Sequence, residues 1–338
     1  MDIDFIIVGQ GIAGTLLASA LEDLGKTFVI IDDKRNHAAS RLAAGLINPI
    51  TGRRFVKSWN YDELENYFLD GYGKIEIKLK QKYLHVHEIV FCLSSVKEEN
   101  DLLAQSMVYH YDDRLEKIYQ VEGVRNLTGR ILYSLQGYKL EQRKLCDDFR
   151  NKWISESKIK NEKFDFSLLN TEADAVIYKD IRAKSIIFCQ GAFASENPYF
   201  KELPVIPNKG QYLVVDTLDW KNDKTIKDQI IITEKDGYQW VGATYEWQYK
   251  TAEPTLQAKE FLLNKLNSLL DIPFTIMEHH IGLRPTTQNR RPIIAQNEHY
   301  PVLWAINGLG TKGASICPYL INHFLDIYEG KAENNFKT

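Results

Sequence analysis

The feature that most constrains the fold is a glycine-rich turn near the N-terminus. Residues 4–8 form a short apolar run, typical of a strand buried on both faces of a parallel sheet. The motif Gly9-x-Gly11-x-x-Gly14 follows, and apolar residues at helical spacing then predict a helix over 15–24. A second strand is expected over 27–31, ending at Asp32. This strand, turn, helix and strand are the βαβ pattern of a dinucleotide-binding domain.

Each position of the motif has a physical role. Gly9 permits the tight turn, Gly11 lets the backbone approach a pyrophosphate, and Gly14 lets the helix pack closely on the strand. The helix N-terminus offers free N–H groups to phosphates. Asp32 would accept hydrogen bonds from ribose hydroxyls, and its charge would repel a 2′-phosphate. NAD and FAD proteins share this motif, so the motif alone leaves the dinucleotide open.

The rest of the N-terminal half mixes helices and strands. Residues 33–60 carry turn residues and several Lys and Arg, which predict a long functional loop. The expected elements after it are a helix over 61–80, a strand over 84–91, a helix over 96–107, short strands reaching residue 133, a helix over 139–155, and strands over 174–178 and 185–189.

Beyond residue 204 the pattern becomes antiparallel. The expected elements are strands over 211–216, 229–233 and 238–244, with a turn at 234–237, a helix that starts at Pro254, a strand over 302–307, a loop over 308–313 and a helix over 314–329. No internal repeat is visible.

Size and charge exclude several classes. A chain of 338 residues is long enough for about two domains. The formal charge of −3 gives no global attraction to nucleic acid or anionic membranes. The N-terminus lacks a signal-peptide pattern, no apolar run could span a bilayer, and the four cysteines show no CxxC spacing. We therefore expect a cytoplasmic protein with reduced thiols and no membrane partner.

Five further motifs occur in an order that is specific when they are taken together. They are Pro207-Asn-Lys-Gly-Gln211, Gly242-Ala-Thr-Tyr-Glu246, Gly282-Leu-Arg-Pro-Thr-Thr287, Arg291-Pro-Ile-Ile294 and Gly308-Leu-Gly-Thr-Lys-Gly313. Along nearly the whole chain, they resemble the D-amino-acid oxidase/glycine oxidase superfamily of FAD-dependent oxidoreductases. Two of them also resemble the flavin domain of the bifunctional tRNA 5-methylaminomethyl-2-thiouridine biosynthesis protein. In these 338 residues we expect no counterpart of the methyltransferase domain of that protein.

The resemblance implies a mixed α/β and α+β fold. A Rossmann-type FAD-binding domain would be assembled from the discontinuous segments 1–60, 135–205 and 280–338. An antiparallel β-rich substrate domain, as in D-amino-acid oxidase, would comprise residues 61–134 and 206–279.

The resemblance also implies a noncovalent FAD and its binding residues. The ADP part would contact Gly9, Gly11, Ile12, Ala13, Gly14, Asp32 and Asp33. The pyrophosphate and flavin would lie along Ser40, Arg41, Ala44, Gly45, Gly191 and Ala192. The flavin N1/C2=O edge would face Gly308, Gly310, Thr311, Lys312 and Gly313. There, the positive end of the last helix and Lys312 would stabilise negative charge on the reduced flavin.

Arg284 matches the glycine-oxidase arginine that holds the substrate carboxylate, a task suited to a planar guanidinium. Other positions depart from the family. A substrate-contacting tyrosine is replaced at about Ile230, and Asn289 stands where an aspartate is usual. No cysteine near Arg284 could tether FAD, and Cys317 is in the wrong place for this. Simple glycine oxidation is therefore in doubt, and no catalytic base is assigned.

The leading function is FAD-dependent oxidation of the C–N bond of a primary or secondary amine or amino acid. The hydride would pass to flavin N5, and oxygen would be the acceptor. The alternative is oxidation of a carboxymethylaminomethyl group on a tRNA wobble uridine, bound through the same Arg284 and a basic rim. A flavin-binding scaffold without turnover is a third possibility. The histidine pairs 85/87 and 279/280 lack the accompanying ligands of a metal site, so no metal is expected.

Overall fold

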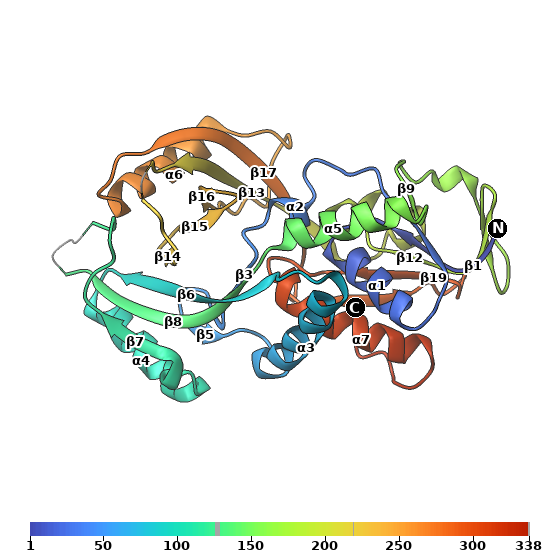
Figure 1. The fold of residues 1–338 in the computed structure, drawn as a ribbon, viewed down its shortest axis with the longest axis horizontal. Helices are drawn as coiled ribbons and strands as arrows, with labels where there is room; N and C mark the ends of the chain where they lie inside the picture. The colour runs from blue at the N-terminus through green and yellow to red at the C-terminus, as the bar shows by residue number, and fades with distance from the viewer. Residues whose placement is uncertain (126–128, 219, 337–338) are drawn as a thin grey trace.

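The computed structural model describes residues 1–125, 129–218 and 220–336, and it contains two lobes (Figure 1). One lobe is built on a sheet with parallel strands at its centre and the other on a largely antiparallel sheet. This is the mixed fold expected from the sequence. Among the described residues, no helix combines the length and apolar character that crossing a membrane requires.

The first sheet has the order β10-β11-β12-β1-β2-β9, and β19 joins β12 and β18 at one side. The pairings of β1 with β2 and β12, and of β12 with β19, are parallel. The strand bounds are β1 (Asp2–Val8), β2 (Phe28–Ile31), β9 (Ile159–Lys160), β10 (Leu169–Thr171), β11 (Val176–Tyr178), β12 (Ile181–Phe188), β18 (Ile293–Gln296) and β19 (Leu303–Asn307).

Side chains along β1 point alternately to the two faces of this sheet, and both faces are covered by other residues. Phe5 and Ile7 pack in one core with the helices, whereas Ile6 and Val8 pack in a second core on the opposite face. The helices of the first core are α1 (Ile12–Asp23), α3 (Tyr61–Leu79), α5 (Gln142–Ser155) and α7 (Gly313–Tyr328). The strand and helix predicted on either side of the glycine turn are thereby confirmed.

The second sheet has the order β17-β13-β16-β15-β14-β6-β8-β3, with β7 paired to β8. Its strands are β3 (Leu46–Ile47), β6 (Leu84–Leu93), β7 (Leu115–Ile118), β8 (Ile131–Leu140), β13 (Val205–Asp216), β14 (Thr225–Lys227), β15 (Ile231–Lys235), β16 (Tyr238–Gly242) and β17 (Thr275–Thr287). Helices α4 (Val96–Tyr109) and α6 (Leu256–Leu269) belong to this lobe (Figure 1).

Several expected elements differ from the structure. The 33–60 loop contains the short helix α2 (Ala39–Leu42) and strands β3, β4 (Ile50–Thr51) and β5 (Val56–Lys57). The helix expected over 139–155 begins at Gln142, because β8 continues to Leu140 on its pairing with β6. Helix α6 begins at Leu256 rather than at Pro254, because the Thr255 hydroxyl caps it by accepting the Ala258 N–H.

The packing also differs from the expected domain boundaries. Helix α3 was assigned to the substrate domain with residues 61–134, yet its apolar face lies in the core of the first sheet with α1 and α7. Strands β8 and β17 extend the second sheet beyond the limits of 135 and 280. We keep the two-domain division as a proposal with these changes.

Candidate active site

The glycine motif forms the turn between β1 and α1. Gly9 has a φ of +98°, and a Cβ there would lie 2.5 Å from the Cys189 carbonyl oxygen. A Cβ at Gly14 would lie 1.9 Å from the Gly9 carbonyl oxygen, so α1 packs against the turn only because Gly14 lacks a side chain. Helix α1 therefore starts directly beside the ends of two parallel strands.

The start of α1 opens into a cavity of about 1350 Å³ between the two sheets. This volume exceeds the usual upper range of about 1,000 Å³ for small-molecule pockets. Among the predicted cofactor and substrate residues, Gly14 and Gly308 do not line it, and the others do. The lining members are Gly9, Gly11, Ile12, Ala13, Asp32, Asp33, Ser40, Arg41, Ala44, Gly45, Gly191, Ala192, Arg284, Gly310, Thr311, Lys312 and Gly313.

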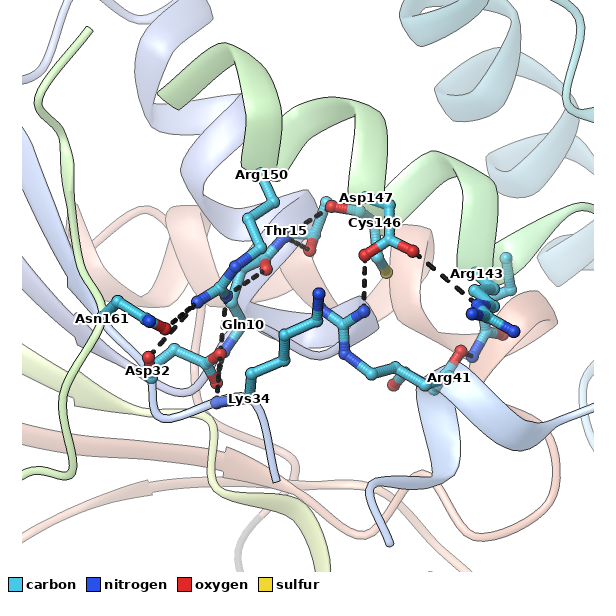
Figure 2. A network of polar contacts seen from close by, with 12 residues as sticks. Gln10, Thr15, Asp32, Lys34, Arg41, Arg143, Cys146, Asp147, Arg150 and Asn161 are labelled. Atoms are coloured by element: carbon cyan, nitrogen blue, oxygen red, sulfur yellow. Dashed lines mark hydrogen bonds and ion pairs between the residues drawn. The ribbon is translucent and has the colours of Figure 1, made fainter. Parts of the chain in front are cut away.

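Asp32 lines the cavity and is held by one ion pair and two backbone hydrogen bonds (Figure 2). Its Oδ2 accepts from Arg150 Nη1 at 2.7 Å and from the Lys34 N–H at 3.0 Å, and its Oδ1 accepts from the Gln10 N–H at 2.9 Å. A carboxylate has about four acceptor positions, so Oδ1 keeps one free. Asp32 can therefore still accept one ribose hydroxyl, which is fewer than the sequence reading suggested.

Arg150 is the member of this network that sequence reasoning missed. It projects from α5 and is 4% exposed, and it also donates to Gln10 Oε1 at 2.9 Å and Asn161 Oδ1 at 2.7 Å (Figure 2). No spacing signal marks it, because its partner Asp32 lies 118 residues earlier in the chain. Asp33, predicted beside the cofactor, pairs with Arg35 at 3.1 Å at the edge of the same cavity.

Ser40 and Arg41 place polar groups beside the start of α1. The Ser40 hydroxyl accepts the Ile12 N–H at 2.9 Å. Arg41 pairs with Asp147 through Nη1, while its Nη2 is buried and has no hydrogen-bond partner among the described residues. A glycine turn, a helix N-terminus and an unpartnered buried guanidinium nitrogen are suited to the pyrophosphate of an anionic dinucleotide. The residues therefore fit the cofactor that the motif predicts.

Arg284 lies on β17 in another part of the cavity wall. Its Nη1 donates to Asn208 Oδ1 at 2.7 Å and to the Thr244 carbonyl at 3.0 Å, and its Cζ lies 4.4 Å from the Tyr245 ring centroid. Within the described part of the chain, no carboxylate lies within ion-pair distance of this guanidinium. Burial lowers the pKa of Arg284 from its ordinary value. The side chain is thus a positioned cation whose hydrogen-bond partners are neutral oxygens.

The absence of a side chain at Gly210 leaves space for the Arg284 guanidinium beside the backbone of β13. A Cβ at Gly210 on the neighbouring strand β13 would lie 2.1 Å from Arg284 Nη2. The glycine is therefore required where the guanidinium crosses β13.

Lys312 is the N-cap residue of α7, in the loop that was predicted to face the flavin. The Gly310 N–H donates to the Pro285 carbonyl at 2.9 Å, which ties this loop to the strand that carries Arg284. Lys312 Nζ donates to Ser58 Oγ at 2.9 Å. Burial, followed by the charges of Arg290 and Arg291, lowers the pKa of Lys312 to about 8.

Other residues singled out in the sequence lie elsewhere. Ile230 is buried and does not line the cavity, and Cys317 is buried in α7. His85 bonds Glu141 at 2.9 Å, and His87 bonds Thr225 Oγ1 at 2.8 Å. In the parts of the chain that the structure covers, no cluster of three or more His, Cys, Asp or Glu could hold a metal ion.

Comparison with known proteins identifies the family. The family model described as FAD dependent oxidoreductase (DAO) matches residues 4–321. Similar solved structures include iminodiacetate oxidase from Chelativorans sp. BNC1, with a TM-score of 0.80, 19% identity, and 98% of each chain covered. Glycine oxidase from Bacillus cereus ATCC 14579 has a TM-score of 0.81 at 17% identity, covering 98% of this chain and 96% of that one. Glycine oxidase from Geobacillus kaustophilus has a TM-score of 0.82 at 17% identity, covering 99% and 96%. At these identities the likeness establishes the fold.

Proposed function

Because the chain belongs to the DAO family of FAD-dependent oxidoreductases, we propose that it oxidises the C–N bond of a small amine or amino acid that carries a carboxylate. The observation that carries the proposal is Arg284, a largely buried guanidinium in the cavity wall whose described hydrogen-bond partners are neutral oxygens. Burying an unpaired charge is costly, so a ligand carboxylate is its natural counterion. The names of glycine oxidase and iminodiacetate oxidase describe substrates of this class.

Some of the cavity residues would bind the cofactor, and others would bind the substrate. The turn at Gly9–Ala13 and Arg41 would hold the pyrophosphate of a noncovalent FAD, and Asp32 would hold its ribose. When bound there, FAD supplies a hydride acceptor for the carbon next to the amine nitrogen. Arg284 would fix the substrate through its carboxylate, while Asn208 and the Thr244 carbonyl orient the guanidinium. Positioning of this kind is a major source of rate acceleration.

The proposed reaction converts the amine to an imine, which water hydrolyses, and molecular oxygen takes the electrons to give hydrogen peroxide. The substrate amine reacts in its neutral form, and we assign no residue as its base. The alternative substrate, a carboxymethylaminomethyl group on tRNA, would use the same arginine for its carboxylate. None of the three similar proteins described above is named for an RNA substrate. The experiment below therefore tests the tRNA substrate only as the alternative.

The test is anaerobic reduction of the purified flavoprotein, followed by loss of the flavin absorption near 450 nm, a typical flavin band. Glycine, sarcosine, iminodiacetate, D-amino acids, and tRNA with and without the carboxymethylaminomethyl group are added separately. We expect a small carboxylated amine to bleach the flavin, and admission of oxygen to restore the band with release of peroxide. Bleaching by the modified tRNA alone would replace the small-amine proposal with the RNA alternative.

The variant Arg284→Met tests the observation on which the proposal rests. Loss of a buried charge-assisted pair, worth about 1.5–3 kcal/mol, should slow flavin reduction by at least about tenfold while flavin stays bound. Reduction at the wild-type rate would remove Arg284 from the reaction.

A further inference from the structure

Two half-buried lysines in the cavity wall have no counterion among the residues that the structure describes. Lys227 ends β14, and Lys312 caps α7; both are half-buried and line the cavity. In the order of the second sheet, the strands β13, β16 and β15 separate β14 from β17, which carries Arg284. Lys227 therefore lies on a different part of the cavity wall from Arg284, whereas the loop that carries Lys312 is tied to β17 by the Gly310–Pro285 hydrogen bond.

Lys227 Nζ lies 4.6 Å from the centroid of the Phe91 ring. No described carboxylate lies within 4 Å of it, and no described group accepts a hydrogen bond from it. Lys312 Nζ has the Ser58 hydroxyl as its partner and likewise has no described acid within 4 Å. Burial, followed by the positive charge of Lys312, lowers the pKa of Lys227 to about 8. The positive charge of Lys312 thus acts on Lys227, and both side chains line the same cavity.

A third lysine of the cavity region, Lys209, has a carboxylate partner that these two lysines do not have. Lys209 is 1% exposed, and it is paired with Glu246 Oε2 at 3.4 Å and with the Thr251 carbonyl at 3.4 Å. Acids do line the same cavity, among them Asp33, Glu98 and Asp228, yet none is within ion-pair distance of Lys227 or Lys312. Because an unpaired, partly buried charge is costly, an anionic ligand is a suitable counterion for these ammonium groups.

Resting on the proposed function, we propose that Lys227 and Lys312 form a second anion subsite that takes a further carboxylate of the substrate. The preferred substrate is then an amine with two acid groups, one held by Arg284 and the other by the two lysines. The lysines supply charge and short hydrogen bonds to that group, and the Phe91 ring restricts where the Lys227 ammonium can move.

The test uses the flavin-loaded protein and unreactive carboxylates. Acetate, malonate, succinate and glutarate are titrated in, and their dissociation constants are measured by perturbation of the flavin spectrum and by calorimetry. We expect at least one dicarboxylate to bind about tenfold or more tightly than acetate, as one additional charge-assisted contact provides. The variant Lys227→Met should abolish this preference and leave acetate binding within twofold of wild type.

The controls separate an effect of the Lys227 charge from an effect on folding or from the loss of any lysine. Lys224→Met removes an ammonium that is paired with Glu88 at 2.7 Å and does not line the cavity, so it should keep the preference. Lys227→Gln keeps a polar group without charge and serves if the methionine variant does not fold. Lys227→Arg should retain the preference.

Three results separate this inference from the proposed function. Equal binding of acetate and every dicarboxylate by the wild type overturns the second subsite. An equal loss of acetate and dicarboxylate binding in Lys227→Met also overturns it, because the lysine would then act on the cavity as a whole. If acetate binding is unchanged in Arg284→Met, the proposed function itself fails, since the first carboxylate would have another site.

Discussion

Replacing Arg150 by methionine tests whether the buried ion pair with Asp32 organises the cofactor end of the cavity. Arg150 and Asp32 have side-chain exposures of 5% and 13%, and the variant leaves the Asp32 carboxylate without its cation. Gln10 Oε1 and Asn161 Oδ1 lose a donor in the same change. The helix itself should persist, because methionine is a good helix former.

The expected loss of stability in Arg150→Met follows from the burial of the Arg150–Asp32 ion pair. Removing one partner of a buried pair destabilises a protein by about 3–5 kcal/mol. The residual exposure of Asp32 places the expected loss near the lower limit, about 3 kcal/mol. At about 2–4 °C per kcal/mol for a domain of 150–250 residues, the melting temperature of the apoprotein should fall by roughly 6–12 °C. FAD affinity should fall by about tenfold, as Asp32 loses the contact that fixes its orientation.

The assay is a double-mutant cycle of Arg150→Met and Asp32→Asn, with thermal unfolding of the apoprotein and FAD titration as separate readouts. The double variant should be more stable than the sum of the single losses predicts, by about 1–3 kcal/mol. Lys152→Met is the matched control on the same helix. Its partners Glu22 and Glu156 are more exposed than Asp32 and both keep Lys158 as a second cation, so the expected change is only about 1 kcal/mol. Additivity within about 0.5 kcal/mol would refute the coupling.

Three further predictions concern glycine positions and one buried lysine. Gly210→Ala should slow reduction by carboxylated amines about tenfold or more with flavin retained, since its Cβ would lie 2.1 Å from Arg284 Nη2; unchanged reduction would contradict this. Gly14→Ala should abolish FAD binding or folding, because its Cβ would meet a backbone carbonyl at 1.9 Å, whereas Gly73→Ala has nothing within 4 Å and should bind FAD normally in the same titration. Burial lowers the pKa of Lys235 in the folded state to about 8, against an ordinary value of about 10.4 for the unfolded chain. Between these values the unfolded state binds more protons, so in urea unfolding the stability of wild type relative to Lys235→Met should rise from pH 8 to pH 10; a flat difference would contradict the shift.

Local sequence patterns were sufficient to predict the elements that depend on residues close together in the chain. The βαβ opening follows from one apolar run, one glycine turn and one helical period, and all three appear where they were expected. Strand β17 was not predicted, because its residues are mostly polar and its long pairing with β13 joins segments about seventy residues apart in the chain. Strand β3 likewise exists through its pairing with β8, so residues 33–60 were interpreted as a loop.

The residues of the candidate site likewise divide into those that local sequence motifs predicted and those that they did not. The glycine turn, Asp32 and Arg284 belong to motifs that the sequence displays. Arg150 and Lys227 belong to none, because their significance depends on which groups face them after folding: Asp32 faces the first, and no described acid faces the second. Sequence reasoning found the residues whose chemistry is fixed by local geometry and missed those whose roles depend on distant partners.

The first sheet combines strands that are synthesised first with strands that are synthesised last. Strand β12 pairs with β1 on one side and with β19 on the other, so residues near both ends of the chain meet at its centre. The cavity wall likewise runs from Val8 to Ser315. A nascent chain still lacking β19 and the loop after it has neither the final strand nor the Lys312 side of the cavity. We therefore expect ribosome-bound intermediates to expose an incomplete sheet edge, and the cavity wall to be completed only after residues up to Ser315 have left the exit tunnel.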